Sequence, residues 1–184
     1  MQNTKTTGWI QTHTGRQFFP LEPEEGDINI VDIAHALAQQ CRFSGHTSVF
    51  YSIAEHSVRA AGLLPAPLAL WGLLHDASEA YLVDIPRPLK CMPEFAGYRE
   101  AEARLQSMIY RKYGLIGDPP PELKAADDTL VLTEGRDLLG LQVAPWGIAG
   151  RPLAEPILYP WTPDEAEGAF DRVFSELMRE HTDV

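Results

Sequence analysis

The 184-residue chain is 45% hydrophobic and 22% charged, which is typical of one globular domain long enough to bury its own core. Its formal net charge of −11 argues against a polymeric nucleic acid partner, because binding to a phosphate backbone needs an extended basic face. No apolar run approaches the roughly 18 residues that span a bilayer. We therefore expect no membrane association. Cys41 and Cys91 form no paired motif, so we also expect no disulfide framework and a cytoplasmic location.

The segment 1–27 predicts a small β-hairpin followed by a loop. Residues 9–12 and 16–19 carry aromatic or β-branched side chains on either side of a glycine-containing turn. The stretch 20–26, rich in proline and glutamate, then leads into the helical part of the chain.

Residues 28–140 predict a helical core. Its first helix begins at Ile28 or Ile30, after a cap at Asp27 or Asn29, and shows apolar residues at helical spacing to its end near residue 40.

Two more helices follow a loop that contains glycine and serine. One is expected from Ser48 or Ser52 to Ala61, beyond which a glycine and a proline stop it. The next begins at Pro67, a residue suited to a first helical turn, and continues through residues 68–74 into His75-Asp76. This run is apolar on nearly all sides, so we expect it to be the buried central helix.

The rest of the chain alternates between proline-rich turns and helices. Two prolines predict an extended, non-helical turn at 83–88. Long helices are expected at 93–113 and 122–139, and a terminal helix at 163–180 follows the proline-rich loop 141–162. The whole chain, 1–184, is therefore predicted to form one all-α domain with a minor β-hairpin.

The most informative stretch follows the central apolar run. There His75 is followed directly by Asp76, and Glu79 lies one helical turn after His75. Neighbouring residues on a helix point about 100° apart, so His75 and Asp76 can share one metal ion only near a helix end. Glu79 is then placed to act on a water molecule without being a ligand. The bland alternative, a core histidine beside a capping aspartate, is the commoner meaning of an isolated His-Asp pair.

Further metal ligands are available on two other predicted helices. His56 lies among small and apolar residues, and Asp127 and Asp128 border an apolar helix face, where a carboxylate is costly unless it is paired or ligating. Taken singly, each is explained as well by a satisfied core histidine or a surface charge. Two histidines and two aspartates from three helices, however, would make a divalent-metal site with open positions for water.

Taken together, these motifs resemble those of a known family. Four motifs over roughly residues 8–140 occur in the order seen in the HD-domain phosphohydrolases: Glu55-His56-Ser57, Leu74-His75-Asp76-Ala77-Ser78-Glu79, Asp84-Ile85-Pro86-Arg87-Pro88-Leu89-Lys90 and Lys124-Ala125-Ala126-Asp127. The chain is most similar to the bacterial 5′-deoxynucleotidases and to small phosphohydrolases of phages and prophages. The resemblance implies an HD-domain helical bundle that holds a divalent metal through the four ligands His56, His75, Asp76 and Asp127, in preference to Asp128.

The resemblance also implies roles around the metal. The carboxylate of Glu79 would handle the attacking water, and Asp84 is a candidate general acid on the leaving side. Arg42 and Phe43 stand where the family has an Arg-Trp pair that grips phosphate and checks the sugar. Because phenylalanine has no indole N–H, Phe43 keeps steric exclusion but loses polar sensing of a hydroxyl.

Two lysines complete the predicted substrate site. Lys90 follows the Pro-Arg-Pro turn, and Lys124 lies three residues before Asp127 on the same helix, so both are candidates for phosphate binding. The alternative for each is an ordinary solvated charge, the usual state of lysine. Trp146 and Trp161, in the loop 141–162, are candidates either to cover the pocket or to pack against the terminal helix, and we expect packing.

These residues predict a metal-dependent phosphohydrolase whose substrate is a small nucleotide. Mixed imidazole and carboxylate ligands suit Zn²⁺, Mn²⁺ and Co²⁺. A (deoxy)nucleoside 5′-monophosphate giving nucleoside and phosphate is the first reading. A triphosphohydrolase that releases tripolyphosphate from a dNTP is the second, and a non-catalytic nucleotide sensor or a helical interaction protein are rivals from other classes. Association into a homo-oligomer is compatible with the long amphipathic helix and the acidic composition.

Overall fold

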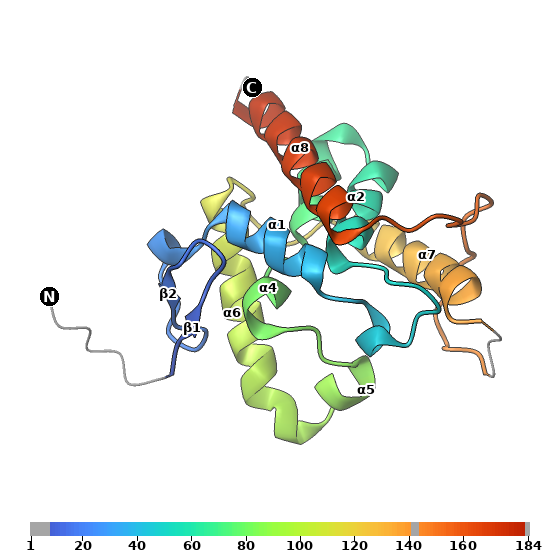
Figure 1. Ribbon diagram of the computed structural model, residues 1–184, viewed down its shortest axis with the longest axis horizontal. Coiled ribbons are helices and arrows are strands. Elements are labelled where there is room, and N and C mark those ends of the chain that lie inside the picture. The colour runs from blue at the N-terminus through green and yellow to red at the C-terminus, as the bar shows by residue number, and fades with distance from the viewer. Residues whose placement is uncertain (1–7, 141–143, 183–184) are drawn as a thin grey trace, which may run out of the picture.

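The computed structural model describes residues 8–140 and 144–182, and these are mainly helical with one two-stranded hairpin (Figure 1). The prediction of an all-α fold with a small N-terminal hairpin is confirmed. Strands β1 (Ile10–Gln11) and β2 (Gln17–Phe18) pair antiparallel, with Ile10 opposite Phe18. A lone hairpin is marginal in water. This one is anchored by Phe18, which is fully buried and stacks on Tyr81 with ring centroids 3.9 Å apart.

Helices α1 (Ile30–Gln39) and α2 (Ile53–Leu63) begin at side-chain caps. The side chain of Asn29 accepts a hydrogen bond from the Val31 amide at 3.0 Å, so Asn29 rather than Asp27 is the cap of α1. The Ser52 hydroxyl accepts from the Glu55 amide at 3.0 Å and starts α2. Helix α2 therefore begins after the later of the two predicted starting points.

The central helix α3 (Ala69–Leu74) follows a short 3₁₀ turn (Ala66–Leu68), and all six of its residues are buried as predicted. It packs so closely on α2 that a Cβ atom added at Gly72 would lie 2.9 Å from both the Cα and the amide nitrogen of Ala61. Only glycine fits at this contact. The close approach of the two backbones carries the residues after α3 towards α2.

The prediction that the whole of 83–88 is non-helical is wrong at its end. After α4 (Glu79–Leu82) the chain is extended only to Pro86, and α5 (Arg87–Lys90) already includes Pro88. A proline in the first turn of a helix sacrifices no backbone hydrogen bond, because that amide has no partner within the helix.

Three longer helices complete the bundle: α6 (Ala96–Lys112), preceded by a 3₁₀ turn (Pro93–Phe95), α7 (Pro121–Leu138) and α8 (Pro163–Thr182). Helix α8 lies across α1 and α2 (Figure 1). Residues 144–162 hold no helix or strand, as predicted for that part of the loop, while 141–143 lie outside the described residues. Among the described residues, no helix is both long and apolar enough to cross a membrane.

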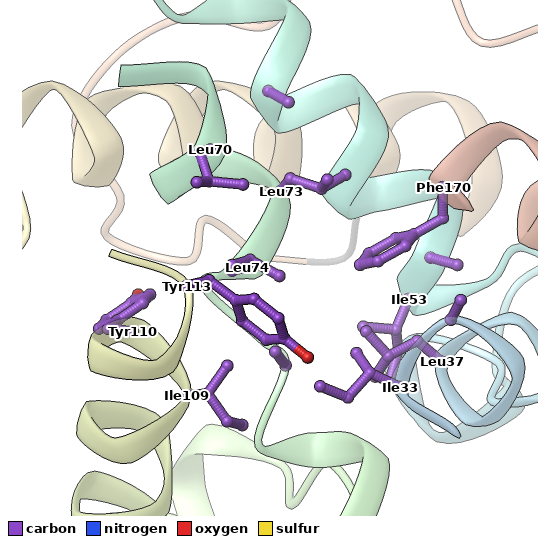
Figure 2. Close-up of a cluster of buried hydrophobic side chains, with 14 of the residues drawn as sticks. Ile33, Leu37, Ile53, Leu70, Leu73, Leu74, Ile109, Tyr110, Tyr113 and Phe170 are labelled. Carbon is purple, nitrogen blue, oxygen red and sulfur yellow. The ribbon is translucent and has the colours of Figure 1, made fainter. Parts of the chain in front are cut away.

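One core joins these elements (Figure 2). Buried side chains from α1, α2, α3, α8 and the C-terminal end of α6 converge there, among them Ile33, Leu37, Ile53, Leu70, Leu73, Leu74, Ile109, Tyr113 and Phe170. Because α2 and α3 are fixed on this core, the polar groups at their ends are held in place by packing rather than by their own contacts.

Candidate metal centre

Four side chains from three segments meet at one end of the α2–α3 contact. His56 comes from α2, His75 and Asp76 from the turn after α3, and Asp127 from α7. The Nε2 atoms of His56 and His75 are 3.2 Å apart. Asp76 Oδ2 lies 3.2 Å from His75 Nε2, and Asp127 Oδ1 lies 3.4 Å from His56 Nε2. All four residues expected to bind a metal are thus brought together, although they are spread over more than seventy positions of the sequence.

The turn after α3 is what lets adjacent residues face the same point. Gln106 of α6 donates to the Leu74 carbonyl at 2.6 Å and accepts from the Ser78 amide at 2.9 Å. Those two backbone groups would bond to each other if α3 continued, so the Gln106 amide takes the place of that helical hydrogen bond. The helix ends at Leu74, one residue short of the predicted His75-Asp76, and this ending allows both side chains to reach one site.

The outer nitrogens of the two histidines determine which ring atoms face the site. His56 Nδ1 lies 2.6 Å from Glu134 Oε1, and His75 Nδ1 lies 2.7 Å from the Gly72 carbonyl oxygen. Carboxylate and carbonyl oxygens accept hydrogen bonds, so both Nδ1 atoms carry protons. When both rings are neutral, the lone pair of each Nε2 atom faces the other Nε2 atom and the carboxylates of Asp76 and Asp127. These electron-rich atoms repel one another unless a cation lies between them. Ligand atoms about 2.1 Å from one metal are separated by about 3.0–3.4 Å. The donor atoms of His56, His75 and Asp76 come close to this spacing, since they all lie within 4.8 Å of one another, and Asp127 adjoins the group through His56.

The pKa values of the clustered side chains also indicate that a positive charge is stabilised at this point. Burial opposes a charge on His56, but Glu134 and Asp127 outweigh it and raise the pKa of His56 to about 9. Burial likewise opposes ionisation of Asp76 and Asp127, yet the nearby histidines hold the pKa of both carboxyls below the usual range. Without a metal, the cluster therefore keeps a proton on His56 in the position where a cation would bind.

Glu134 is a part of the site that the sequence analysis missed. Its side chain is fully buried on α7, and its second oxygen accepts from Arg42 Nε at 3.1 Å. Burial opposes its charge, but Arg42 and His56 together lower the pKa of Glu134 to about 2. Arg42 in turn reaches Asp76 Oδ2 at 3.4 Å. A signal existed: Glu134 lies seven residues, or two helical turns, after Asp127 and so on the same face of α7.

The two predicted catalytic carboxylates lie beside the cluster. Glu79 begins α4, is almost fully buried, and its Oε2 atom has no hydrogen-bond partner among the described residues. Burial and the charges of Asp76 and Asp84 raise the pKa of Glu79 well above its ordinary value. Burial also raises the pKa of Asp84, against the opposing effects of Arg42 and Lys90. Paired carboxyls with raised pKa values in one cleft are typical of acid–base sites.

The predicted phosphate-binding cations are placed differently from one another. Lys90 Nζ lies 2.7 Å from Glu102 and 3.8 Å from Glu79, at the edge of the site. Lys124 is largely exposed on α7, where its ammonium group pairs with Asp128. That pairing leaves Asp127 as the aspartate that faces the histidines, while Lys124 points to a neighbour on its own helix.

An open cavity lies beside the cluster, on the side of Arg42 and Asp84. It measures about 560 Å³ and is lined by residues that include Arg42, Phe43, His46 and Asp84. Both members of the predicted Arg-Phe pair therefore border one space, with Arg42 on the side of the cluster. Trp161 packs against the core, which includes residues of α8, whereas Trp146 lies against Gly135 of α7, is 42% exposed and lines a cavity.

Comparison with known proteins finds relatives that match most of the chain. An uncharacterized protein of Escherichia coli strain K12, YfdR, is 39% identical over 173 residues, which cover 92% of this chain and 95% of that protein. An uncharacterized protein of Rhodobacter capsulatus, RCAP_rcc00048, is 34% identical over 164 residues, 82% of each chain. No family model matches the chain.

Proposed function

The chain belongs to the protein family that includes E. coli YfdR, and we propose that it is a divalent-metal-dependent phosphohydrolase acting on nucleotides. The observation that carries the proposal is the pair of histidine Nε2 atoms 3.2 Å apart, flanked by Asp76 and Asp127, with both Nδ1 atoms engaged elsewhere. Apolar packing gives no reason to gather these groups, whereas a divalent cation does.

His56, His75, Asp76 and Asp127 would hold a divalent metal, which would supply the Lewis acidity that activates a water molecule and offsets charge on a phosphoryl group. Glu79 takes the proton of the attacking water, since it lies next to Asp76 and one of its oxygens lacks a hydrogen-bond partner among the described residues. Asp84, whose pKa is also raised, donates a proton to the leaving oxygen. Arg42 and Lys90 offset charge on the non-bridging phosphoryl oxygens.

The substrate we propose first is a (deoxy)nucleoside 5′-monophosphate, which gives a nucleoside and inorganic phosphate. It follows from the resemblance to the HD-domain 5′-deoxynucleotidases and from the Arg42–Phe43 pair at the mouth of the site. The same ligand set also suits attack on the α-phosphorus of a dNTP, with tripolyphosphate as the second product. With free thiols at Cys41 and Cys91, we place the protein in the cytoplasm.

The decisive experiment is a product panel on protein stripped with EDTA and resupplied with Zn²⁺, Mn²⁺, Co²⁺ or Mg²⁺. Metal-dependent phosphate release from dNMPs or NMPs supports a nucleotidase. Nucleoside and tripolyphosphate from dNTPs would instead support the triphosphohydrolase. If no metal yields a product from any nucleotide, the proposal of a hydrolase fails and the non-catalytic sensor is favoured.

A matched pair of variants tests the metal ligands. Asp127→Ala should lose both metal retention and turnover, whereas Asp128→Ala, one residue further along α7 and paired with Lys124, should retain both. Glu79→Gln should keep the metal and lose at least about 100-fold in kcat, the usual contribution of a general base. Loss of the metal from Glu79→Gln would make Glu79 a ligand.

A further inference from the structure

A second cavity lies next to the one that Arg42 and Asp84 line, and its own lining is mainly apolar and aromatic. It measures about 510 Å³, and its lining includes Phe43, Pro88, Cys91, Trp146 and Ile148. Phe43 borders both this outer cavity and the inner one that contains Arg42 and Asp84. The Phe43 side chain therefore separates two neighbouring cavities, and the inner one contains the arginine proposed to contact the phosphoryl group of a substrate.

The backbone at Phe43 is strained in a way that sets the direction of its ring. Phe43 and Ser44 both have a φ of +53°, a left-handed conformation that is unusual for a residue as bulky as phenylalanine. The segment is held by hydrogen bonds from Arg42 N to Tyr51 O at 2.9 Å and from His46 N to Phe43 O at 3.0 Å. As a result Arg42 contacts Glu134 and Asp76, while the Phe43 ring faces Trp146 at 6.0 Å between centroids.

Trp146 is held in place from the opposite side. A Cβ atom added at Gly135 would lie 2.6 Å from the Trp146 ring, so the indole rests directly on the backbone of α7. Gly135 is the residue after Glu134, whose carboxylate orients His56. The same turn of α7 thus supports the metal cluster on one side and an indole that is 42% exposed on the other.

We propose that Phe43 and Trp146 form a stacking pocket for the nucleobase of the substrate. The inference rests on the proposed nucleotide hydrolase activity, and it assigns the outer cavity to the base and the inner one to the sugar and phosphate. Every nucleobase presents a π face, so stacking on aromatic rings tolerates different bases. Among the described residues that line the outer cavity, Arg87 alone carries a charge. The pocket should therefore accept purines and pyrimidines with little discrimination.

Kinetics with matched variants test the pocket. Trp146→Ala should lower kcat/KM for nucleoside monophosphates about tenfold, mainly through KM, because the stacking of a base is lost. Turnover of deoxyribose 5-phosphate, which has no base, should be unchanged, and Trp146→Phe should restore most of the nucleotide activity. Trp9→Ala removes an indole of similar exposure, 53%, from the N-terminal hairpin and should behave as wild type.

A chemical readout tests the pocket without turnover. Cys91 is an exposed free thiol in the lining of the outer cavity, so a bound nucleoside monophosphate should slow its alkylation by iodoacetamide. Deoxyribose 5-phosphate should give no such protection, and neither should the nucleotide in Trp146→Ala. Cys41, half-buried with its sulfur 3.3 Å from the Thr47 hydroxyl, is an internal control.

The two readouts separate this inference from the proposed function. Unchanged kinetics and unchanged Cys91 protection in Trp146→Ala would overturn the base pocket, even if metal-dependent phosphate release stands. Protection of Cys91 that depends on Trp146, in a protein that hydrolyses no nucleotide, would uphold the pocket and refute the hydrolase. If the wild type shows neither hydrolysis nor protection, both are refuted.

Discussion

Glu134→Gln is the most informative single substitution, because the Glu134 carboxylate connects the metal cluster to Arg42. One oxygen accepts from His56 Nδ1 at 2.6 Å and the other from Arg42 Nε at 3.1 Å, and the side chain is fully buried. Glutamine has the same shape but only one acceptor oxygen. In either orientation of the amide, its NH₂ group must face a donor on His56 or on Arg42.

The size of the effect follows from these contacts. A hydrogen bond to a charged group contributes about 1.5–3 kcal/mol. Glu134→Gln loses one such hydrogen bond and weakens the other, and it leaves the buried Arg42 guanidinium without a full counter-charge. Together these effects should lower the free energy of unfolding by about 3 kcal/mol. For a domain of this length, that lowers Tm by about 6–12 °C. An NH₂ group towards His56 also favours the tautomer with its proton on Nε2, so metal affinity should fall by about 10- to 100-fold.

The assay is metal affinity by competition with a chelator, combined with thermal unfolding. Glu55→Gln is the matched control: Glu55 is also fully buried, lies one residue before His56, and bonds to Arg59 and to the Trp161 amide at 2.8 Å. It should lower Tm without changing metal affinity. The reasoning is refuted if Glu134→Gln binds metal as wild type does, or if Glu55→Gln loses affinity equally.

Three further predictions follow from the same geometry. The pKa of His56 is raised from 6.5 to about 9, so its proton stabilises the metal-free fold below about pH 6.5 and this stabilisation is lost as the pH rises through 9. Because a bound metal displaces that proton, calorimetry should show metal affinity rising about tenfold per pH unit from pH 7 to 9 and then levelling. Gly72→Ala, whose Cβ would lie 2.9 Å from the α2 backbone, should cost about 2 kcal/mol in chemical denaturation, whereas Gly62→Ala, with nothing within 4 Å, should not destabilise. Gln106→Leu leaves the Leu74 carbonyl without its 2.6 Å partner, so dialysed protein should retain less metal; full retention would show that the turn after α3 forms without this side chain.

Local rules were sufficient for most of the helices and for the identity of the candidate ligands. Apolar spacing placed α1, α2 and the long helices, and polar residues just before them marked the caps that Asn29 and Ser52 provide. The ends of elements were less predictable, because they depend on contacts from elsewhere. Helix α3 ends at Leu74 since Gln106, a residue of α6, occupies the backbone groups that would have continued it.

The residues of the candidate site that are close in sequence were predicted, whereas those that meet only through helix packing were missed. His75, Asp76 and Glu79 are neighbours in sequence, so their chemistry is visible as a motif. Glu134 and Trp146 become neighbours of the site only when α7 packs on α2, and the sequence indicates only that Glu134 shares a helix face with Asp127. The face of α7 that carries Asp127 presents Glu134 two turns later, and the next residue is the glycine on which Trp146 rests. A single rotation of α7 about its axis would therefore displace the candidate ligand Asp127, the partner of His56 and the indole together, which couples the proposed base pocket to the candidate metal centre through one rigid element.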